Sequence, residues 1–232
     1  NVNVWIFLIS PIFTPNIIKN KSIQVMKHII LGIALLVSAI GVSQTQMSAT
    51  EAASFKKDIQ SESSKTKTIS ADFDETKHVS VLKKASTSSG IFRLKGERLL
   101  WQYKAPKKSA MLFNKQTLKI KNEKGKTTSI DLNKNKRFKQ LQQLMVGSYN
   151  GNLLDEKSFN ITYFKNGSTK YAVLKPKSKD MAKHIKEVTL TFKNNEETVS
   201  EIKIVESSND YSIIKLKNKK LNTVIGDSVF TL

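Results

Sequence analysis

The chain has 232 residues, a formal net charge of +20 at pH 7 and no cysteine. The lack of cysteine excludes disulfides, thiol nucleophiles and cysteine-ligated metal sites. Lysine carries most of the positive charge, because Arg93, Arg98 and Arg137 are the only arginines, and lysine reads nucleic-acid bases less well than arginine does.

Residues 26–43 have the features of a secretory signal peptide. Lys27 supplies a positive charge, and residues 29–40 form an apolar run that is too short for a comfortable membrane span. The small residues Gly41 and Ser43 precede the expected cleavage site. We therefore expect the protein to be exported and released, which argues against a nucleic-acid partner.

Residues 1–25 precede Met26 and contain a second apolar stretch, residues 5–13, which Pro11 interrupts. Two interpretations remain open: upstream sequence ahead of a true start at Met26, or an additional N-terminal segment that anchors the chain. In either case residues 44–232 are expected to form one domain. Three lysines and no acid lie before it, so the domain carries +17. This charge favours either a solvated lysine surface or attraction to anionic membranes and lipid head groups.

The domain is expected to begin with a helix and to continue as strands. Thr50 is placed to cap a helix over residues 51–63, whose Ala52, Phe55 and Ile59 share one face. The hydrophobic period then changes from 3.6 to 2. Strands are predicted at residues 69–74, 90–94, 98–103, 110–113, 118–121, 127–132, 159–164, 171–174, 188–192, 199–205 and 211–216.

The turns between these strands are short. Asn166-Gly167 is a strong hairpin signal, and short connections make neighbouring strands antiparallel. A second helix is predicted where Phe138, Leu141, Leu144 and Met145 recur at helical spacing, and a weaker one over residues 179–185. About eleven antiparallel strands with two or three helices covering one sheet face indicate a mainly β, α+β protein.

Binding is a better hypothesis than catalysis for this chain. His78 and His184, the histidines that remain after processing, have no neighbour at metal-binding spacing, and no G-x-S-x-G motif is present. The sequence therefore predicts no enzyme, no metal and no cofactor.

An apolar surface between the sheet and the helices is the predicted binding site. Periodicity alone also allows the same residues to form an ordinary filled core. The candidate residues are Ile69, Phe73, Phe92, Leu94, Leu99, Trp101, Leu112, Ile120, Phe138, Leu141, Leu144 and Met145.

Five short segments, in order, resemble the periplasmic outer-membrane lipoprotein carrier family LolA. The resemblance runs from about Glu51 to Leu232. Residues 69–76 resemble its first strand, residues 90–95 its G-x-F-x-V-K-R-P motif, and residues 174–177 match L-x-P-K. The most specific segment is 99–106, which resembles F-R-W-x-Y-x-x-P, and residues 229–231 are similar to the closing F-x-F strand.

The resemblance implies an unclosed, strongly curved antiparallel β-barrel that is lidded by helices and takes up acyl chains. Leu99 lies where the family has an aromatic residue facing the cavity, and Trp101 matches its tryptophan. The family's arginine, which fastens the lid helices, is absent, and Lys95 is the nearest match. A lysine lacks the planar fork of donors, so Lys95 is expected to fasten the lid only partly.

We therefore expect a monomeric periplasmic chaperone that carries acylated lipoproteins to the outer membrane. The resemblance implies an inner-membrane exporter, an outer-membrane acceptor and transient contact with a membrane surface as partners. Two alternatives remain: a carrier of another amphiphile, such as a glycolipid or polyketide-lipid, and an envelope interaction domain with a filled core.

Overall fold

A computed structural model of the chain describes residues 44–82, 84–135, 138–139, 142, 145–146 and 154–232. The predicted signal peptide and residues 1–25 lie outside these ranges, as do the candidate residues Leu141 and Leu144. No helix among the described residues is both long and apolar enough to cross a membrane.

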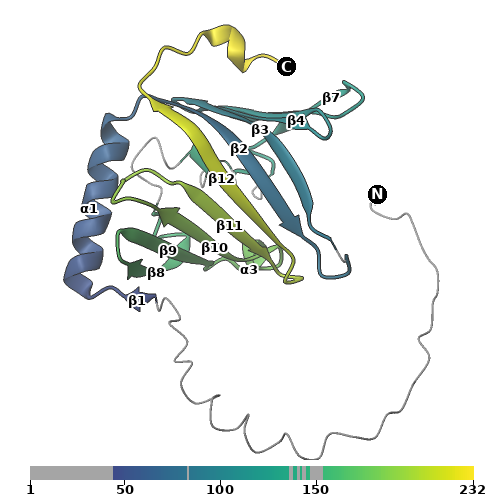
Figure 1. The fold of residues 1–232 in the computed structure, drawn as a ribbon. Coiled ribbons are helices and arrows are strands. Elements are labelled where there is room, and N and C mark those ends of the chain that lie inside the picture. Colours follow the sequence, from purple (N-terminus) through teal and green to yellow (C-terminus); the bar gives the residue numbers. More distant parts are fainter. Residues whose placement is uncertain (1–43, 83, 136–137, 140–141, 143–144, 147–153) are drawn as a thin grey trace, which may run out of the picture. The chain divides into compact units, whose positions relative to one another are not determined.

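The described strands form one 12-stranded antiparallel sheet (Figure 1). Its order is β1-β8-β9-β10-β11-β12-β2-β3-β4-β5-β6-β7, so β1 and β7 are its two edges and the sheet is not closed. The strands are β1 (Thr45–Gln46), β2 (Thr68–His78), β3 (Ser86–Lys95), β4 (Arg98–Ala105), β5 (Ser109–Asn114), β6 (Thr117–Lys121), β7 (Thr127–Asp131), β8 (Phe159–Asn166), β9 (Thr169–Pro176), β10 (Ile185–Phe192), β11 (Glu201–Glu206) and β12 (Tyr211–Leu221).

The predicted fold class is confirmed. The eleven predicted strands correspond to β2–β12, and the antiparallel pairing follows from the short turns. The additional strand, β1, has two residues and pairs with β8. A strand this short has no alternation that a sequence pattern could reveal.

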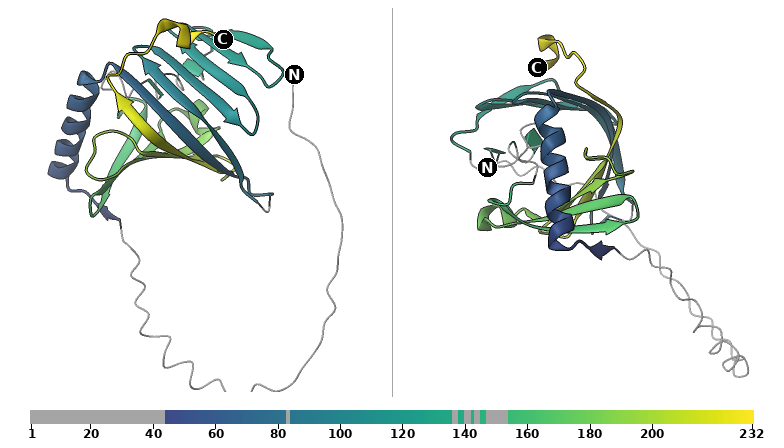
Figure 2. Two further views of the ribbon diagram at one scale, coloured as in Figure 1. Left: turned by 45° about the horizontal axis from the view of Figure 1, so that its top comes forward. Right: turned by 90° about the vertical axis from the view of Figure 1, so that its left-hand side faces the viewer.

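A bulge at the junction between β12 and β2 contributes to the curvature of the sheet. This junction is the pairing that joins the two runs of hairpins, with Tyr211 opposite His78 and Leu221 opposite Ile69. The register shifts between Lys217 and Lys220, and such a bulge bends a strand and increases its twist. Figure 2 shows the resulting curved sheet in two further views.

The first helix, α1 (Ala49–Lys65), begins earlier than predicted. Its N-cap is Ser48 rather than Thr50, because Ser48 and Glu51 form a reciprocal capping box: Glu51 N donates to Ser48 Oγ, and Ser48 N donates to Glu51 Oε2. Lys165 on β8 also forms an ion pair with Glu51. The predicted face is confirmed, since Phe55 and Ile59 are buried.

The other helical elements differ in length from the predictions. In the second predicted helix, the described residues Phe138, Lys139, Gln142, Met145 and Val146 are helical. Helix α3 (Lys179–Ala182) is short, because β10 already begins at Ile185.

The predicted closing strand at residues 229–231 is wrong, because a 3-10 helix, η1 (Asp227–Phe230), stands there. Its Phe230 and the preceding Ile225 pack on Leu100 and Leu112 of the sheet's outer face. A strand in this segment would not bring both apolar side chains onto that face.

Three apolar clusters hold the described residues together. The helix-side cluster joins α1 to β8–β11 through residues such as Phe55, Ile59 and Phe192. The strand-side cluster joins β2–β6 on the inner face through residues such as Phe73, Leu99 and Phe113. The outer cluster packs the C-terminal segment on the outer face. The inner face thus carries two clusters, and Ile202 and Ile204 pack against both of them.

Candidate functional site

A cavity of about 330 Å³ lies on the inner face of the curved sheet, where the two inner clusters meet. Val188 and Leu190 belong to the helix-side cluster, whereas Phe92 and Trp101 belong to the strand-side cluster. Its apolar lining comprises Ile69, Phe92, Trp101, Met111, Met145, Val188, Leu190, Val199, Ile202, Ile204, Ile214, Leu216 and Leu221.

Contacts between aromatic rings hold the Trp101 side chain, which forms one wall of the cavity. The indole of Trp101 stacks on the buried ring of Phe73, with centroids 4.4 Å apart and an interplanar angle of 30°. Phe92, opposite Trp101 in the sheet, meets it edge to face at 5.8 Å. Because these contacts hold the indole from two sides, Trp101 forms a rigid part of the lining.

One end of the cavity is polar and lies between β2, β4 and β11. The Tyr103 hydroxyl donates to Glu75 Oε2 at 2.7 Å, and both burial and the charge of Glu75 raise the pKa of Tyr103. Beside them Lys77 Nζ lies 2.8 Å from Glu206 Oε1. This end therefore presents a partly exposed ion pair and a neutral phenol next to an apolar interior.

The other polar stretch of the lining comes from the end of α1 and from the β10–β11 loop. Glu62, Ser63 and Thr66 contribute from the helix side. Lys219 reaches across to this loop, where its Nζ lies 2.7 Å from Glu196 Oε2 and 2.8 Å from Thr198 Oγ1. The apolar lining thus lies between two polar borders.

The structure brings most of the predicted site residues together on the inner face. Ile69, Phe92, Trp101 and Met145 line the cavity. Phe73, Leu94 and Leu99 belong to the same strand-side cluster but lie behind the lining, almost completely buried. Ile120 and Phe138 are partly buried and pack against that cluster. Leu141 and Leu144 lie outside the described residues.

Leu112 does not belong to this set. It lies opposite Leu100 in the sheet, whereas its neighbours Met111 and Phe113 lie opposite Trp101 and Leu99. Since side chains alternate between faces, Leu112 points to the outer face, where it packs in the outer cluster. Its prediction as a cavity residue is therefore wrong.

Lys95 also has a different role from the predicted one. Its Nζ donates to the carbonyl oxygen of Ile225 at 2.9 Å and to Asp227 Oδ1 at 2.7 Å. Arg98 holds the same carboxylate oxygen at 2.8 Å, and these two hydrogen bonds lower the pKa of Asp227. Because Lys95 and Leu94 are consecutive in β3, they face opposite sides of the sheet. Lys95 thus fastens the C-terminal segment to the outer face instead of fastening lid helices.

Several lining residues were missed from the sequence. Val188, Leu190, Ile202, Ile204 and Ile214 come from β10–β12. Their alternation is visible in the sequence, but nothing local indicates that these strands lie across the cavity from β3 and β4. The pairing of β12 with β2, which places them there, is a long-range contact.

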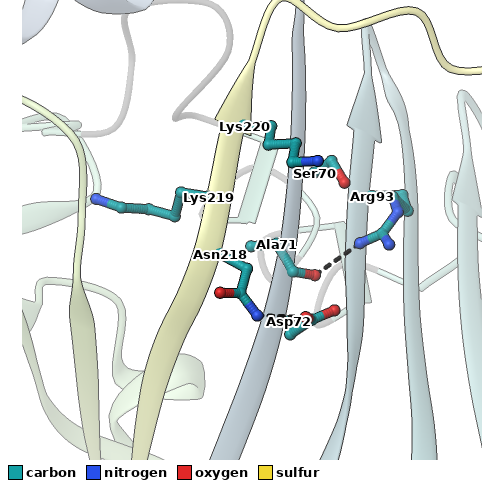
Figure 3. Close-up of a pocket in the computed structure, with 7 residues that line it drawn as sticks. All are labelled: Ser70, Ala71, Asp72, Arg93, Asn218, Lys219 and Lys220. Atoms are coloured by element: carbon teal, nitrogen blue, oxygen red, sulfur yellow. Dashed lines mark hydrogen bonds between the residues drawn. The ribbon is translucent and has the colours of Figure 1, made fainter.

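A second pocket, of about 460 Å³, lies at the bulge in β12 (Figure 3). Its lining is polar: Arg93 Nη1 donates to the carbonyl oxygens of Ala71 and Phe92 at 2.7 and 2.8 Å, and Asn218 Nδ2 donates to Asp72 Oδ2 at 2.9 Å. As Figure 3 shows, Lys219 points away from Arg93. Charged and amide groups suit an apolar ligand poorly, so the inner cavity is the better candidate for a site that binds an apolar ligand.

The inner cavity has the composition of a binding site. Among the residues that the structure describes, no group of three histidine, aspartate or glutamate side chains is placed to hold a metal ion. Concave, largely apolar pockets with a few polar groups are typical ligand sites, with volumes of about 300–1,000 Å³. The arrangement can therefore shield an apolar chain and leave a polar group at either border.

Solved structures with a similar arrangement were found at low sequence identity. A LolA superfamily protein from Nitrosomonas europaea is 12% identical with a TM-score of 0.46, covering 78% of this chain and 97% of its own. An outer-membrane lipoprotein-sorting protein domain from Vibrio parahaemolyticus is 8% identical with a TM-score of 0.43, covering 76% and 97%. LprF from Mycobacterium bovis is 10% identical with a TM-score of 0.42, covering 77% and 96%.

A search among curated proteins gave no match. The family comparison, in contrast, is extensive: residues 64–232 match the family described as "Outer membrane lipoprotein carrier protein LolA". This range begins at the end of α1 and includes β2–β12 and η1. The chain therefore belongs to the LolA family.

Proposed function

We propose that the chain is a periplasmic carrier that shields the acyl chains of lipoproteins on their way to the outer membrane. In this proposal residues 26–43 direct export and residues 44–232 form the carrier domain. The observation that carries it is the apolar inner cavity, between two polar borders, in a chain of the LolA family.

The physical basis of such transport is differential burial. Each methylene group that leaves water gains about 0.8 kcal/mol, so an acyl anchor needs a shielded site during its passage. The cavity of about 330 Å³ is at the small end of ligand pockets. A small, rigidly walled site limits the gain per chain, which favours release at the destination.

The cavity also bears on the alternative of a filled core. A domain that acts only through its surface has no need of a void lined by Trp101, Ile202 and Ile204, because native cores are packed close to crystal density. The proposal therefore places the cargo's chains against these side chains. An inner-membrane exporter that supplies the cargo and an outer-membrane acceptor that takes it are its expected partners.

Ile204 offers a direct test, because it lines the cavity and is followed by an outward-facing residue. Val205 lies opposite Tyr211 on β12, whereas Ile204 lies opposite Ser212 at the cavity. In Ile204→Gln an amide replaces an apolar wall, which costs about 1–3 kcal/mol when it meets an acyl chain. Fatty-acid affinity should fall about fivefold or more, while Val205→Gln should leave it unchanged. Equal affinities for both variants would contradict the proposed site.

The identity of the cargo needs a second experiment. The protein is purified from its native envelope, and bound lipids and proteins are identified by mass spectrometry, with Ile204→Gln as the matched control. Acylated lipoproteins that are enriched with the unaltered protein and lost with the variant are the expected result. Enrichment of a glycolipid or another amphiphile instead would overturn the lipoprotein assignment while retaining a carrier.

A further inference from the structure

The tip of the β2–β3 hairpin exposes two adjacent aliphatic side chains. Val81 is 86% exposed and Leu82 is 58% exposed. Among the described residues, the other large apolar side chain that is exposed to this degree is Val224, near the opposite end of the sheet. Apolar surface in water costs about 25 cal/mol per Å², so two neighbouring aliphatic residues at a protruding tip call for a functional reason.

The tip is held in place by the neighbouring β11–β12 turn. Ser80 N donates to Asp210 Oδ1 at 2.8 Å, and Leu82 N donates to the Val79 carbonyl oxygen at 2.8 Å. At its base the His78 ring stacks on Tyr211, with centroids 4.4 Å apart. The hydrogen bonds from Ser80 lower the pKa of Asp210, which keeps this anchor charged. These contacts attach the hairpin to the β11–β12 turn at residues that directly precede Val81 and Leu82.

Lysines lie on the turns next to the tip on one side of it, at the same end of the sheet, whereas the β11–β12 turn on the other side contributes Asp210. Because β3 pairs with β4, with Ser89 opposite Ala105, the β4–β5 turn lies at the same end as the β2–β3 tip. Lys84 comes two residues after Leu82, and the β4–β5 turn contributes Lys107 and Lys108. Glu123 on the β6–β7 turn lies 3.0 Å from Lys107, and Lys124 and Lys126 flank it with two further positive charges.

We propose that this end of the sheet docks on an anionic lipid bilayer, with Val81 and Leu82 inserted among the lipid head groups and the neighbouring lysines on the lipid phosphates. Apolar insertion together with attraction of basic residues is the combination by which proteins bind membrane surfaces reversibly. The inference rests on the proposed carrier function and names the surface on which cargo would be received or delivered.

Charge complementarity favours a bilayer over a protein as the occupant. A stable protein interface buries about 800 Å² on each partner and is depleted in lysine, whereas here two aliphatic side chains stand beside lysines. Two side chains can insert into a bilayer without a large interface, and each nearby lysine adds electrostatic attraction to the anionic lipids.

The position of the cavity agrees with this orientation. The polar border of the cavity at Lys77 and Glu206 lies at the same end of the sheet as the β2–β3 tip. Lys77 directly precedes His78 at the base of the tip. Docking would therefore bring this border of the cavity to the membrane surface. An acyl chain that leaves the bilayer there would pass beside the partly exposed Lys77–Glu206 ion pair into the apolar lining.

A single fluorescent label tests the docking locally, since the chain has no cysteine. Full-length Val81→Cys is labelled with an environment-sensitive dye and mixed with vesicles of phosphatidylglycerol and phosphatidylcholine, or of phosphatidylcholine alone. The matched control is Val224→Cys, labelled in the same way at the other exposed aliphatic position. A local label distinguishes insertion of the tip from any membrane binding by residues 1–43.

The expected result is a blue shift and quenching by brominated lipid at position 81 with the anionic vesicles, weak with the neutral vesicles and absent at position 224. Lys107→Gln with Lys108→Gln should weaken the response, by about fivefold per lysine. The control pair Lys119→Gln with Lys215→Gln, on the body of the sheet, should leave it unchanged. Equal signals at positions 81 and 224, or equal responses to both kinds of vesicle, would overturn the docking proposal.

Fatty-acid binding by the same labelled proteins separates the two proposals. A variant that takes up fatty acid but does not insert at position 81 contradicts the docking surface alone. A protein that inserts but takes up no fatty acid supports the docking surface and contradicts the carrier proposal on which it rests.

Discussion

Gly90 lies directly opposite Phe73 in the sheet, and the Phe73 ring occupies the space where a side chain at position 90 would lie. A Cβ atom at Gly90 would stand 2.6 Å from Phe73 Cζ and 2.0 Å from the Gln102 carbonyl oxygen. Phe73 in turn supports Trp101 from behind, at 4.4 Å. Because Gly90 has no side chain, the Phe73 ring can lie where it supports Trp101 in the cavity wall.

Gly90→Ala should destabilise the protein, although replacing glycine within a strand usually helps. The added methyl group must displace the Phe73 ring and the backbone of β4, and overpacking of this kind costs about 1–3 kcal/mol. The control is Gly226→Ala, where φ is −64° and the nearest atom lies 3.6 Å away. Urea unfolding measures both variants. Equal stability of the two would show that the sheet accommodates the methyl group at position 90.

Glu51 should make the attachment of α1 sensitive to acid. The hydrogen bonds from Lys165 and Ser48 lower its pKa from 4.5 to about 2. A carboxylate with a lowered folded-state pKa stabilises the fold above its unfolded-state pKa, and this contribution is lost as the pH falls through the folded-state value. The stabilisation is therefore complete above pH 4.5 and disappears towards pH 2.

Glu51→Gln should flatten the pH dependence of stability between these two values, as measured by urea midpoints at several pH values. Lys165→Gln removes the largest cause of the shift, so the carboxyl resonance of Glu51 should titrate closer to its ordinary pKa. An unchanged titration in Lys165→Gln would show that the ion pair between α1 and β8 does not form in solution.

Lys95→Gln should loosen the C-terminal segment and leave α1 unaffected. The substitution removes the hydrogen bonds to Ile225 and Asp227, while Arg98 continues to hold Asp227. Exposed ion pairs contribute about 0–1 kcal/mol, so the loss of global stability should be small. Hydrogen exchange should quicken at residues 225–230 and stay constant in α1. A change confined to α1 would restore the lid-fastening role that the sequence predicts.

Strands were predictable because each hairpin is specified locally. Asn166-Gly167 sets the β8–β9 turn, and Gly167 adopts a positive φ of 55° there. The curvature and the junction of β12 with β2 depend on contacts between distant residues. The last part of β12 could not be predicted from the sequence. Polar residues in the lysine-rich bulge from Lys217 to Lys220 continue the strand after its apolar alternation ends.

The face of the sheet on which a candidate residue lies is readable from the sequence where the other face of the strand is polar, and ambiguous where both faces are apolar. In β5 the run Ala110-Met111-Leu112-Phe113 has no alternation, because the cavity lies on one side and the C-terminal segment covers the other. Leu112 was therefore assigned to the wrong face. Thr50 was predicted as the N-cap of α1, but the reciprocal hydrogen bonds between Ser48 and Glu51 place the cap at Ser48.

The carrier function that we propose requires the inner cavity to take up an acyl chain beside Trp101. The test is quenching of Trp101 fluorescence by a brominated long-chain fatty acid in the Trp5→Phe variant, where Trp101 is the remaining tryptophan. Bromine quenches only at contact range, so we expect saturable quenching at one fatty acid per protein, with weaker binding in Ile204→Gln. No saturable quenching, in a correctly folded protein, would contradict the carrier account.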